Sequence, residues 1–272
     1  MFGLRALTAA GLLAGFLAAL LWLDAIAFAG LVGCVVALGA REWARLLGYA
    51  SARSLGYALA CALLFAAVAV WLQPPRSSAA PLAVIWSVAF AFWLLVVPLL
   101  LWRGLAAPAR AWLPLAGVIV LVPAALAMAW MEPGMLLAML GLVWVADTAA
   151  YLAGRAFGRR RLAPAISPGK TWEGVAGGVL GSLAYAIIVA LSWPELGRRV
   201  VGVAWLAYLA GVIVLCAASI LGDLFESAMK RRAGVKDSGA VLPGHGGVLD
   251  RIDSATAVLP IGALLASWIE SA

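Results

Sequence analysis

The chain is poor in the side chains with which soluble proteins face water. Asp, Glu, Lys and Arg make up 11% of its 272 residues, whereas 66% are hydrophobic and the mean hydropathy is +1.07. A soluble globular domain carries about 25% charged residues. The composition therefore excludes a soluble domain and predicts an integral membrane protein.

Cysteine and histidine are also scarce. The cysteines lie in apolar runs without Cys-x-x-Cys or Cys/His spacing, and the only histidine is His245. We therefore predict neither a disulfide nor a zinc site. Because this histidine has no serine partner in a recognisable nucleophile motif, the sequence gives no support to a Ser-His-Asp catalytic site.

Long apolar runs recur along the chain, and a helix needs about 20 residues to cross the hydrocarbon core of a membrane. They predict an all-α integral membrane protein with about nine transmembrane helices, near 6–23, 25–40, 54–72, 81–102, 111–130, 134–154, 172–192, 201–221 and 254–269. Only Asp24 separates the first two runs, and we expect a helical hairpin because a single helix over both would be about 52 Å long. The alternative is a cleaved signal peptide that ends near Ala27.

Basic residues are unevenly distributed around these spans. With a cytoplasmic N-terminus, all but three of the 19 Lys and Arg residues fall on the cytoplasmic side, the exceptions being Arg76, Arg198 and Arg199. Since cytoplasmic loops collect Lys and Arg, we predict a cytoplasmic N-terminus and a multi-pass protein of the inner (cytoplasmic) membrane. Anionic lipid head groups then account for the net charge of +7, and we expect no nucleic-acid partner.

Polar residues concentrate in the second half of the chain. We divide it into an N-terminal transmembrane scaffold, 1–133, and a C-terminal region with the candidate catalytic residues, 134–272, whose cytoplasmic loops are 155–171 and 222–253. The two loops face the same side, so they could meet. The scaffold has only three acids, so we expect it to serve packing, lipid contact or oligomer contact. A homodimer is one such oligomer.

Acids in or beside membrane helices are costly, so they mark functional sites. Asp147 lies within one predicted span, Asp223 follows another, and Asp250 and Asp253 precede the last. Carboxylates without thiolates suit Mg2+, which usually takes one or two carboxylates together with phosphates and water. Helix capping is the alternative role for Asp250 and Asp253.

Basic residues and glycines accompany these acids. If the helix continues past Asp223, then Asp223, Ser227 and Lys230 share one face. Arg231 and Lys236 join Lys230 as candidates for phosphate contacts. The combination favours phosphoryl or nucleotidyl transfer at the cytoplasmic surface. A cation transporter is the alternative from a different class.

The segment PGHGGVLDRIDS, residues 243–254, contains the remaining candidates. Gly246 and Gly247 allow backbone N–H groups to come close to an anion. His245 is either a hydrogen-bonded loop residue or a phosphate or base contact.

Three motifs together resemble a known family. Residues 227–253 carry Ser-Ala-Met-Lys-Arg, Lys-Asp and Leu-Pro-Gly-His-Gly-Gly-Val-Leu-Asp-Arg-Ile-Asp, which closely resembles the signature of the phosphatidate cytidylyltransferases, or CDP-diacylglycerol synthases. The resemblance extends to Asp147 with its neighbours and to residues 167–174, SPGKTWEG. Many family members have Lys at the position of Gly169, so a basic contact there is either missing from this chain or supplied by Arg159 to Arg161.

The resemblance implies that CTP and phosphatidate give CDP-diacylglycerol and pyrophosphate, with Mg2+ required. It matches the metal-binding aspartates to Asp223 and Asp250, and we add Asp253 and Asp147 as further metal candidates, with a second, monovalent cation as an open alternative. We expect catalytic roles for Asp223, Asp250, Lys230 and Lys236. The expected substrate contacts are Ser167, Lys170, Thr171, Ser227, Arg231, His245, Gly246, Gly247 and Arg251. The alternative is a cytidylyltransferase that acts on another lipid phosphate, or an enzyme similar to a polyprenol kinase.

Overall fold

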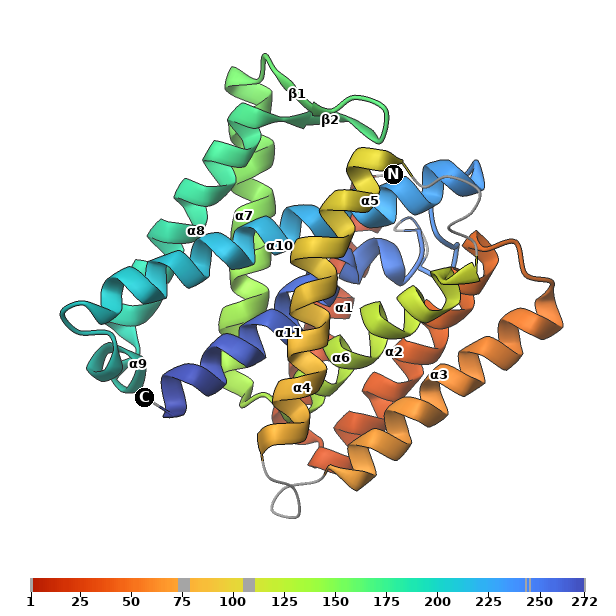
Figure 1. The fold of residues 1–272 in the computed structure, drawn as a ribbon, viewed down its shortest axis with the longest axis horizontal. Helices are drawn as coiled ribbons and strands as arrows, with labels where there is room; N and C mark the ends of the chain where they lie inside the picture. The colour runs from red at the N-terminus through yellow and green to blue at the C-terminus, as the bar shows by residue number, and fades with distance from the viewer. Residues whose placement is uncertain (1, 73–78, 105–110, 243, 245, 272) are drawn as a thin grey trace.

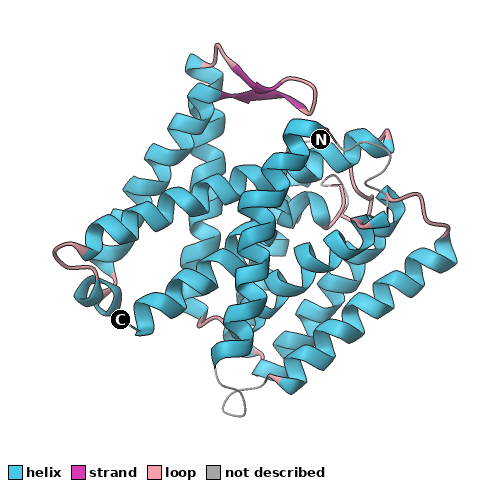
Figure 2. Cartoon of the chain, viewed as in Figure 1, coloured by secondary structure: helices cyan, strands magenta, loops and turns pink. Residues whose placement is uncertain are grey.

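The computed structural model describes residues 2–72, 79–104, 111–242, 244 and 246–271, which are mostly helical (Figure 1 and Figure 2). A π-helix, η1 (Phe92–Val96), joins α4 to α5, and β1 (Arg161–Ala163) pairs with β2 (Ser167–Thr171). The α-helices are α1 (Phe2–Trp22), α2 (Ala25–Leu46), α3 (Ser51–Trp71), α4 (Ala79–Ala91), α5 (Val97–Arg103), α6 (Leu113–Trp130), α7 (Pro133–Phe157), α8 (Trp172–Ser192), α9 (Pro194–Arg199), α10 (Ala204–Ala233) and α11 (Leu249–Ser271).

Seven helical runs in the described part of the chain are long and apolar enough to cross a membrane: α2, α3, the run Pro81–Arg103, α6, α7, α8 and α10. The predicted class, an all-α multi-pass membrane protein, is therefore confirmed, with one small β-hairpin added. The predicted count of nine is not confirmed, because α1 and α11 fall outside this set. The cytoplasmic side of the N-terminus stays a prediction.

The first two helices separate at Asp24, as expected. The Asp24 carboxylate accepts a hydrogen bond from the Ala27 N–H at 2.8 Å and so caps α2. The rings of Phe16 and Phe28 lie 6.4 Å apart across the break. The two helices therefore touch beside the turn.

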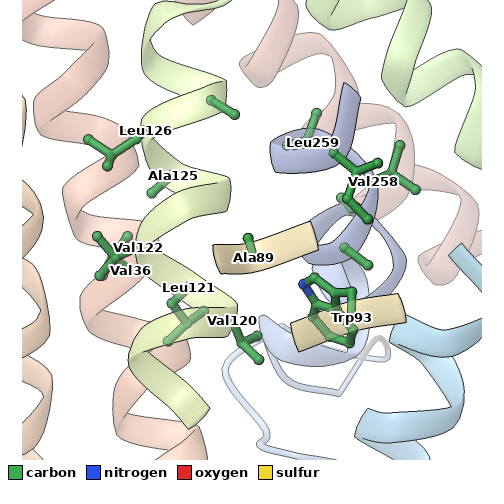
Figure 3. Close-up of a cluster of buried hydrophobic side chains, with 14 of the residues drawn as sticks. Val36, Ala89, Trp93, Val120, Leu121, Val122, Ala125, Leu126, Val258 and Leu259 are labelled. Atoms are coloured by element: carbon green, nitrogen blue, oxygen red, sulfur yellow. The ribbon is translucent and has the colours of Figure 1, made fainter. Parts of the chain in front are cut away.

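Helix α11 lies at the centre of the bundle, in contact with α10, α6, α4 and α7. Every residue from 254 to 264 is buried. Figure 3 shows Val258 and Leu259 of this stretch in one apolar cluster with Ala89 of α4 and Leu121 of α6. A helical segment that is apolar on all sides is buried in a core. Burial of residues 254–264 therefore holds α11 in place, and with it the polar first turn of the helix.

Small residues bring α7 and α8 together. A Cβ built on Gly181 would lie 2.6 Å from the Ala149 Cβ, and one on Gly174 would lie 2.9 Å from the Ala150 carbonyl oxygen. Such glycines allow close approach of membrane helices. Close packing here places Asp147, on α7, and the start of α8 in one region.

The two polar segments are more ordered than the loops predicted from the sequence. Residues 161–171 form the β1–β2 hairpin, with Arg161 opposite Thr171. Helix α10 continues to Ala233 and ends at Gly234, whose φ of 71° is left-handed. Residues 222–233 of the predicted loop are therefore helical, so Asp223 and Lys230 stand on one rigid element.

An aromatic cluster lies beneath this charged part of α10. The Phe225 ring contacts Trp43 of α2, Phe92 and Trp93, with ring centroids 5.8 to 5.9 Å apart. The Trp43 indole N–H also donates to the Leu113 carbonyl at 3.0 Å. The cluster fixes α10 against α2, η1 and the start of α6.

Candidate active site

Lys170 and Asp223 form an accessible ion pair between the hairpin and α10. Their Nζ and Oδ2 atoms lie 2.6 Å apart, and the two side chains remain 25% and 31% exposed. The Ser227 hydroxyl, one helical turn further along, donates to Asp223 Oδ1 at 3.2 Å. Strand β2 thus places the Lys170 ammonium against Asp223, and both side chains stay accessible to a ligand.

Two further carboxylates belong to this neighbourhood. The charges of Asp147 and Asp253 interact with those of Asp223 and Lys170. Gly222 makes the approach of α11 possible, because a Cβ there would lie 3.1 Å from the Ser254 Cα. Asp147 and Asp253 therefore add oxygen donors to the surroundings of the Lys170–Asp223 pair, and carboxylate oxygens are ligands that Mg2+ prefers.

A second set of charges is buried. Lys230 forms ion pairs with Glu226, on its own helix, and with Asp250, whose Oδ1 lies 2.7 Å from the ammonium. The Lys230, Glu226 and Asp250 side chains are 13%, 6% and 5% exposed. Lys230, predicted to contact phosphate, is therefore enclosed by two acids in this structure.

Asp250 holds the polypeptide that precedes α11. Its Oδ2 accepts from the Ser238 N–H and hydroxyl, both at 2.9 Å, and from the Gly247 N–H at 2.7 Å. Burial alone would raise the pKa of Asp250, but the hydrogen bonds from Lys230, Gly247 and Ser238 lower it to about 2. The carboxylate is thus ionised at neutral pH, and each oxygen already has a donor.

Glu42 of α2, which the sequence analysis placed in the scaffold, lies against the polypeptide that precedes α11. It is 2% exposed and accepts hydrogen bonds from Ser238, Val248 and Leu249. The rule applied to Asp147, that an acid at a membrane helix marks a site, could have singled it out. Glu226 was also missed, although Glu and Lys at i and i+4 pair on a helix.

The glycines near Asp250 make room for carboxylates. A Cβ on Gly246, whose φ is 79°, would lie 2.7 Å from Asp250 Oδ2. A Cβ on Gly247 would lie 2.5 Å from Glu42 Oε2. The backbone N–H groups of 247–249 therefore donate to the protein's own acids, and the predicted phosphate contacts of Gly246 and Gly247 stay predictions.

Hydrogen bonds hold the β1–β2 hairpin against the start of α8 and against α10. The Glu173 carboxylate accepts from the Arg159 and Arg160 N–H groups at 3.0 to 3.3 Å, and Arg161 donates to the Pro168 carbonyl at 2.8 Å. Arg231 of α10 donates to the Ile166 carbonyl at 3.4 Å. These contacts bring the two predicted polar segments together.

The other predicted site residues have different surroundings. The Thr171 hydroxyl caps α8 by accepting from the Gly174 N–H at 3.1 Å. Ser167 begins β2 opposite Ala163. Lys236 and Arg251 are exposed, and His245 lies outside the described residues. The substrate roles of these residues stay predictions.

The donor set fits Mg2+ only with help from a ligand. Within the described residues, no group of three or more His, Cys, Asp or Glu side chains is placed to hold a metal alone. Mg2+ does not need such a cage, since one or two carboxylates with phosphates and water suffice. Asp223, which is 31% exposed and whose charge interacts with those of Asp147 and Asp253, meets that requirement.

One sizeable cavity lies elsewhere. A cavity of about 450 Å3 is lined by Trp86, Trp130, Glu132 and Trp193 among others, near the α6–α7 and α8–α9 junctions. It contains none of the acids or lysines of the candidate site. The accessible charged residues of the candidate site are therefore separate from this cavity.

Seven helical runs long and apolar enough to cross a membrane, with acids and lysines gathered near the end of α10, suit a membrane-embedded enzyme. A model of the cytidylyltransferase family matches residues 3–269, so the chain belongs to that family. The resemblance drawn from the motifs and the predicted class, a nucleotidyltransferase, are thereby confirmed.

Related proteins agree with this assignment. The chain is 42% identical to the phosphatidate cytidylyltransferase of Pseudomonas aeruginosa over 97% of both chains. It is 52% identical to the protein of that name from Haemophilus influenzae over 44% of this chain and 41% of that one. For the Thermotoga maritima protein of that name, the identity is 42% over 47% of each chain.

Proposed function

We propose that the chain transfers the cytidylyl group of CTP to phosphatidate, giving CDP-diacylglycerol and pyrophosphate. The observation that carries the proposal is the 42% identity to a phosphatidate cytidylyltransferase over 97% of both chains. The site supports it, because an accessible acid and lysine pair lies on α10 and the adjoining hairpin, among helices long and apolar enough to cross a membrane. A soluble nucleotide and a membrane lipid can both reach such a place.

The reaction is an in-line displacement at the α-phosphorus of CTP. A phosphate oxygen of phosphatidate attacks, the new P–O bond forms, and the bond to the pyrophosphate leaving group breaks. The attacking oxygen is already anionic, so no strong general base is needed. Positioning and charge neutralisation then supply most of the catalysis.

The residues divide this work by accessibility. Lys170 is partly exposed and paired only to Asp223 in the described contacts, so it exchanges that partner for a substrate phosphate when one arrives. Exposed Lys236 and Arg251 add positive charge around the nucleotide. Lys230 stays with Glu226 and Asp250 and holds the wall of the site.

Mg2+ is the cofactor of this proposal. When bound, it neutralises negative charge on the triphosphate and aligns the phosphates. Asp223 would hold it, with Asp147 and Asp253 in support. Asp250, the other predicted ligand, would first have to exchange one of its donors, and a metal titration described in the Discussion tests that step. A second, monovalent cation would occupy the same acidic neighbourhood.

The proposal places the protein in the inner (cytoplasmic) membrane with the active site facing the cytoplasm, where CTP is available. The basic hairpin and the end of α10 support this side under the positive-inside rule. The proposal includes no nucleic-acid partner. It is compatible with a monomer and with a homodimer.

The direct test uses purified protein in detergent with labelled CTP, Mg2+ and phosphatidate. We expect a labelled lipid that requires all three, and little product with a polyprenyl phosphate or without an acceptor. Asp223→Asn should abolish turnover while membrane insertion is intact. Asp24→Asn is the matched control, because Asp24 caps α2 away from the site and Asn caps equally well. Failure to form a CTP-derived lipid with any of several divalent ions would refute the proposal.

A further inference from the structure

Glu42 is a buried acid for which the reaction proposed above has no direct use. It lies on α2, while its three hydrogen-bond donors lie 196 to 207 residues further along the chain. A buried carboxylate is costly unless it is well hydrogen-bonded. The long-range contacts therefore raise the question of what this acid organises.

The carboxylate caps the first turn of α11 from another helix. Oε1 accepts from the Val248 N–H at 3.0 Å, and Oε2 accepts from the Leu249 N–H at 2.9 Å. The first N–H groups of a helix have no partner within it, and a negative charge there is favoured by the helix dipole. Glu42 thus fixes where α11 begins, one residue before Asp250.

Ser238 connects Glu42 to Asp250. Its hydroxyl oxygen lies 3.1 Å from Glu42 Oε2 and 2.9 Å from Asp250 Oδ2. The single hydroxyl hydrogen serves one carboxylate at a time, so the two acids share it. Because Asp250 also binds Lys230, a shift of Glu42 is transmitted to both charged groups.

The backbone at Gly239 and Gly247 packs closely against the Glu42 carboxylate. A Cβ on Gly239 would lie 2.8 Å from the Glu42 Cδ, and one on Gly247 would lie 2.7 Å from it. Glycine is therefore needed on two sides of the acid. The backbone between α10 and α11 is shaped around Glu42.

We propose that Glu42 is a positioning residue of the active site: its carboxylate fixes the first turn of α11 and, through Ser238, holds Asp250 and Lys230 in place for the reaction. The inference rests on the proposed function, because the reaction whose rate it sets is the cytidylyl transfer. It assigns to α2 a direct part in a site otherwise built from residues 147–253.

The main test is Glu42→Gln. Gln keeps the shape but has one accepting oxygen, so it cannot accept from both Val248 and Leu249 as Glu42 does. Loss of such a supporting contact lowers the rate by about 10- to 100-fold in comparable sites. We expect that fall in kcat per folded protein, little change in the KM for CTP, and faster tryptic cleavage after Lys236.

Glu132→Gln is the matched control. Glu132 also caps a helix, accepting from the Met135 N–H of α7 at 3.1 Å. One end of α6 lies near Glu42, because Leu113 accepts a hydrogen bond from Trp43 there. Glu132 follows the opposite end of α6, about 27 Å away along the helix. This variant should keep the wild-type kcat and the wild-type cleavage at Lys236.

Ser238→Ala separates positioning from simple stabilisation. It removes the link to Asp250 but leaves both α11 contacts of Glu42, so it remains informative if Glu42→Gln does not fold. We expect it to lower kcat, and we expect the double variant to lose less than the product of the two single losses. A purely structural Glu42 would change the melting temperature and leave kcat per folded molecule unchanged.

The outcomes separate this inference from the proposed function. If the wild-type protein makes the lipid product and Glu42→Gln makes it at the same rate, the inference is wrong and the function stands. If the wild type makes no product, the function fails, and unchanged cleavage at Lys236 in Glu42→Gln would refute the positioning contact as well.

Discussion

Substitution of Lys230 tests how the buried charges around this lysine differ from the accessible Lys170–Asp223 pair. Replacing it by Met keeps the aliphatic length and removes the ammonium between Glu226 and Asp250. Asp250 would retain three donors, from Ser238 and Gly247. Glu226 would retain none, because neither of its oxygens has a hydrogen-bond partner apart from the Lys230 ion pair in the described residues.

The expected cost follows from this uncompensated buried charge. Breaking a buried ion pair by removing one partner costs about 3–5 kcal/mol. Glu226 limits the loss by taking up a proton, so we expect about 3 kcal/mol. At about 2–4 °C per kcal/mol for a chain of this size, Lys230→Met should lower the melting temperature by about 6–12 °C.

The assay is thermal unfolding of the purified variants in one detergent, with Lys170→Met as the comparison. The Lys170 pair is partly exposed, so its loss should cost less than about 1 kcal/mol while turnover falls sharply. Adding Glu226→Gln to Lys230→Met should recover much of the lost stability, since a neutral side chain does not have to take up a proton on burial. A Lys230→Met protein that melts within about 2 °C of the wild type would refute the reasoning.

Three further predictions concern the metal and the glycines. Asp250→Asn should lose most of its turnover; if Asp250 binds the metal, the remaining activity will require more Mg2+, whereas an unchanged Mg2+ midpoint would limit Asp250 to holding the backbone. Gly247→Ala should cost about 1–3 kcal/mol and most of the activity, because its Cβ overlaps Glu42, whereas Gly56→Ala, with nothing near its Cβ, should melt like the wild type. Chelation of divalent ions by EDTA should stop lipid formation reversibly without unfolding the protein, and unfolding on chelation would instead indicate a structural metal.

Local and compositional features of this fold could be predicted from the sequence. Apolar runs predicted the membrane class, and Asp24 marked the break between α1 and α2. Asp223, Ser227 and Lys230 were expected on one helical face, and α10 does continue through all three. Each of these signals depends on neighbours along one helix, so the sequence contains them directly.

The β-hairpin and the partition of the charges could not be predicted in the same way. Strands β1 and β2 have three and five residues and show no apolar alternation. The sequence grouped Lys230 with the phosphate-binding cations because basic residues beside acids and glycines suit both roles. Only the fold decides that Lys230 is enclosed while Lys170 is open, since burial depends on how α10, α11 and the hairpin meet.

Glu42 and Trp43 show how the N-terminal helices take part in the chemistry. These consecutive residues of α2 bind different parts of the C-terminal region, since Glu42 holds the start of α11 and Trp43 contacts Phe225 of α10. Helix α2 therefore cannot shift relative to the site without breaking a polar contact and an aromatic one together. The buried wall of the site is thus preorganised before substrate binds, and reorganisation during the reaction is left to the accessible pair of Lys170 and Asp223.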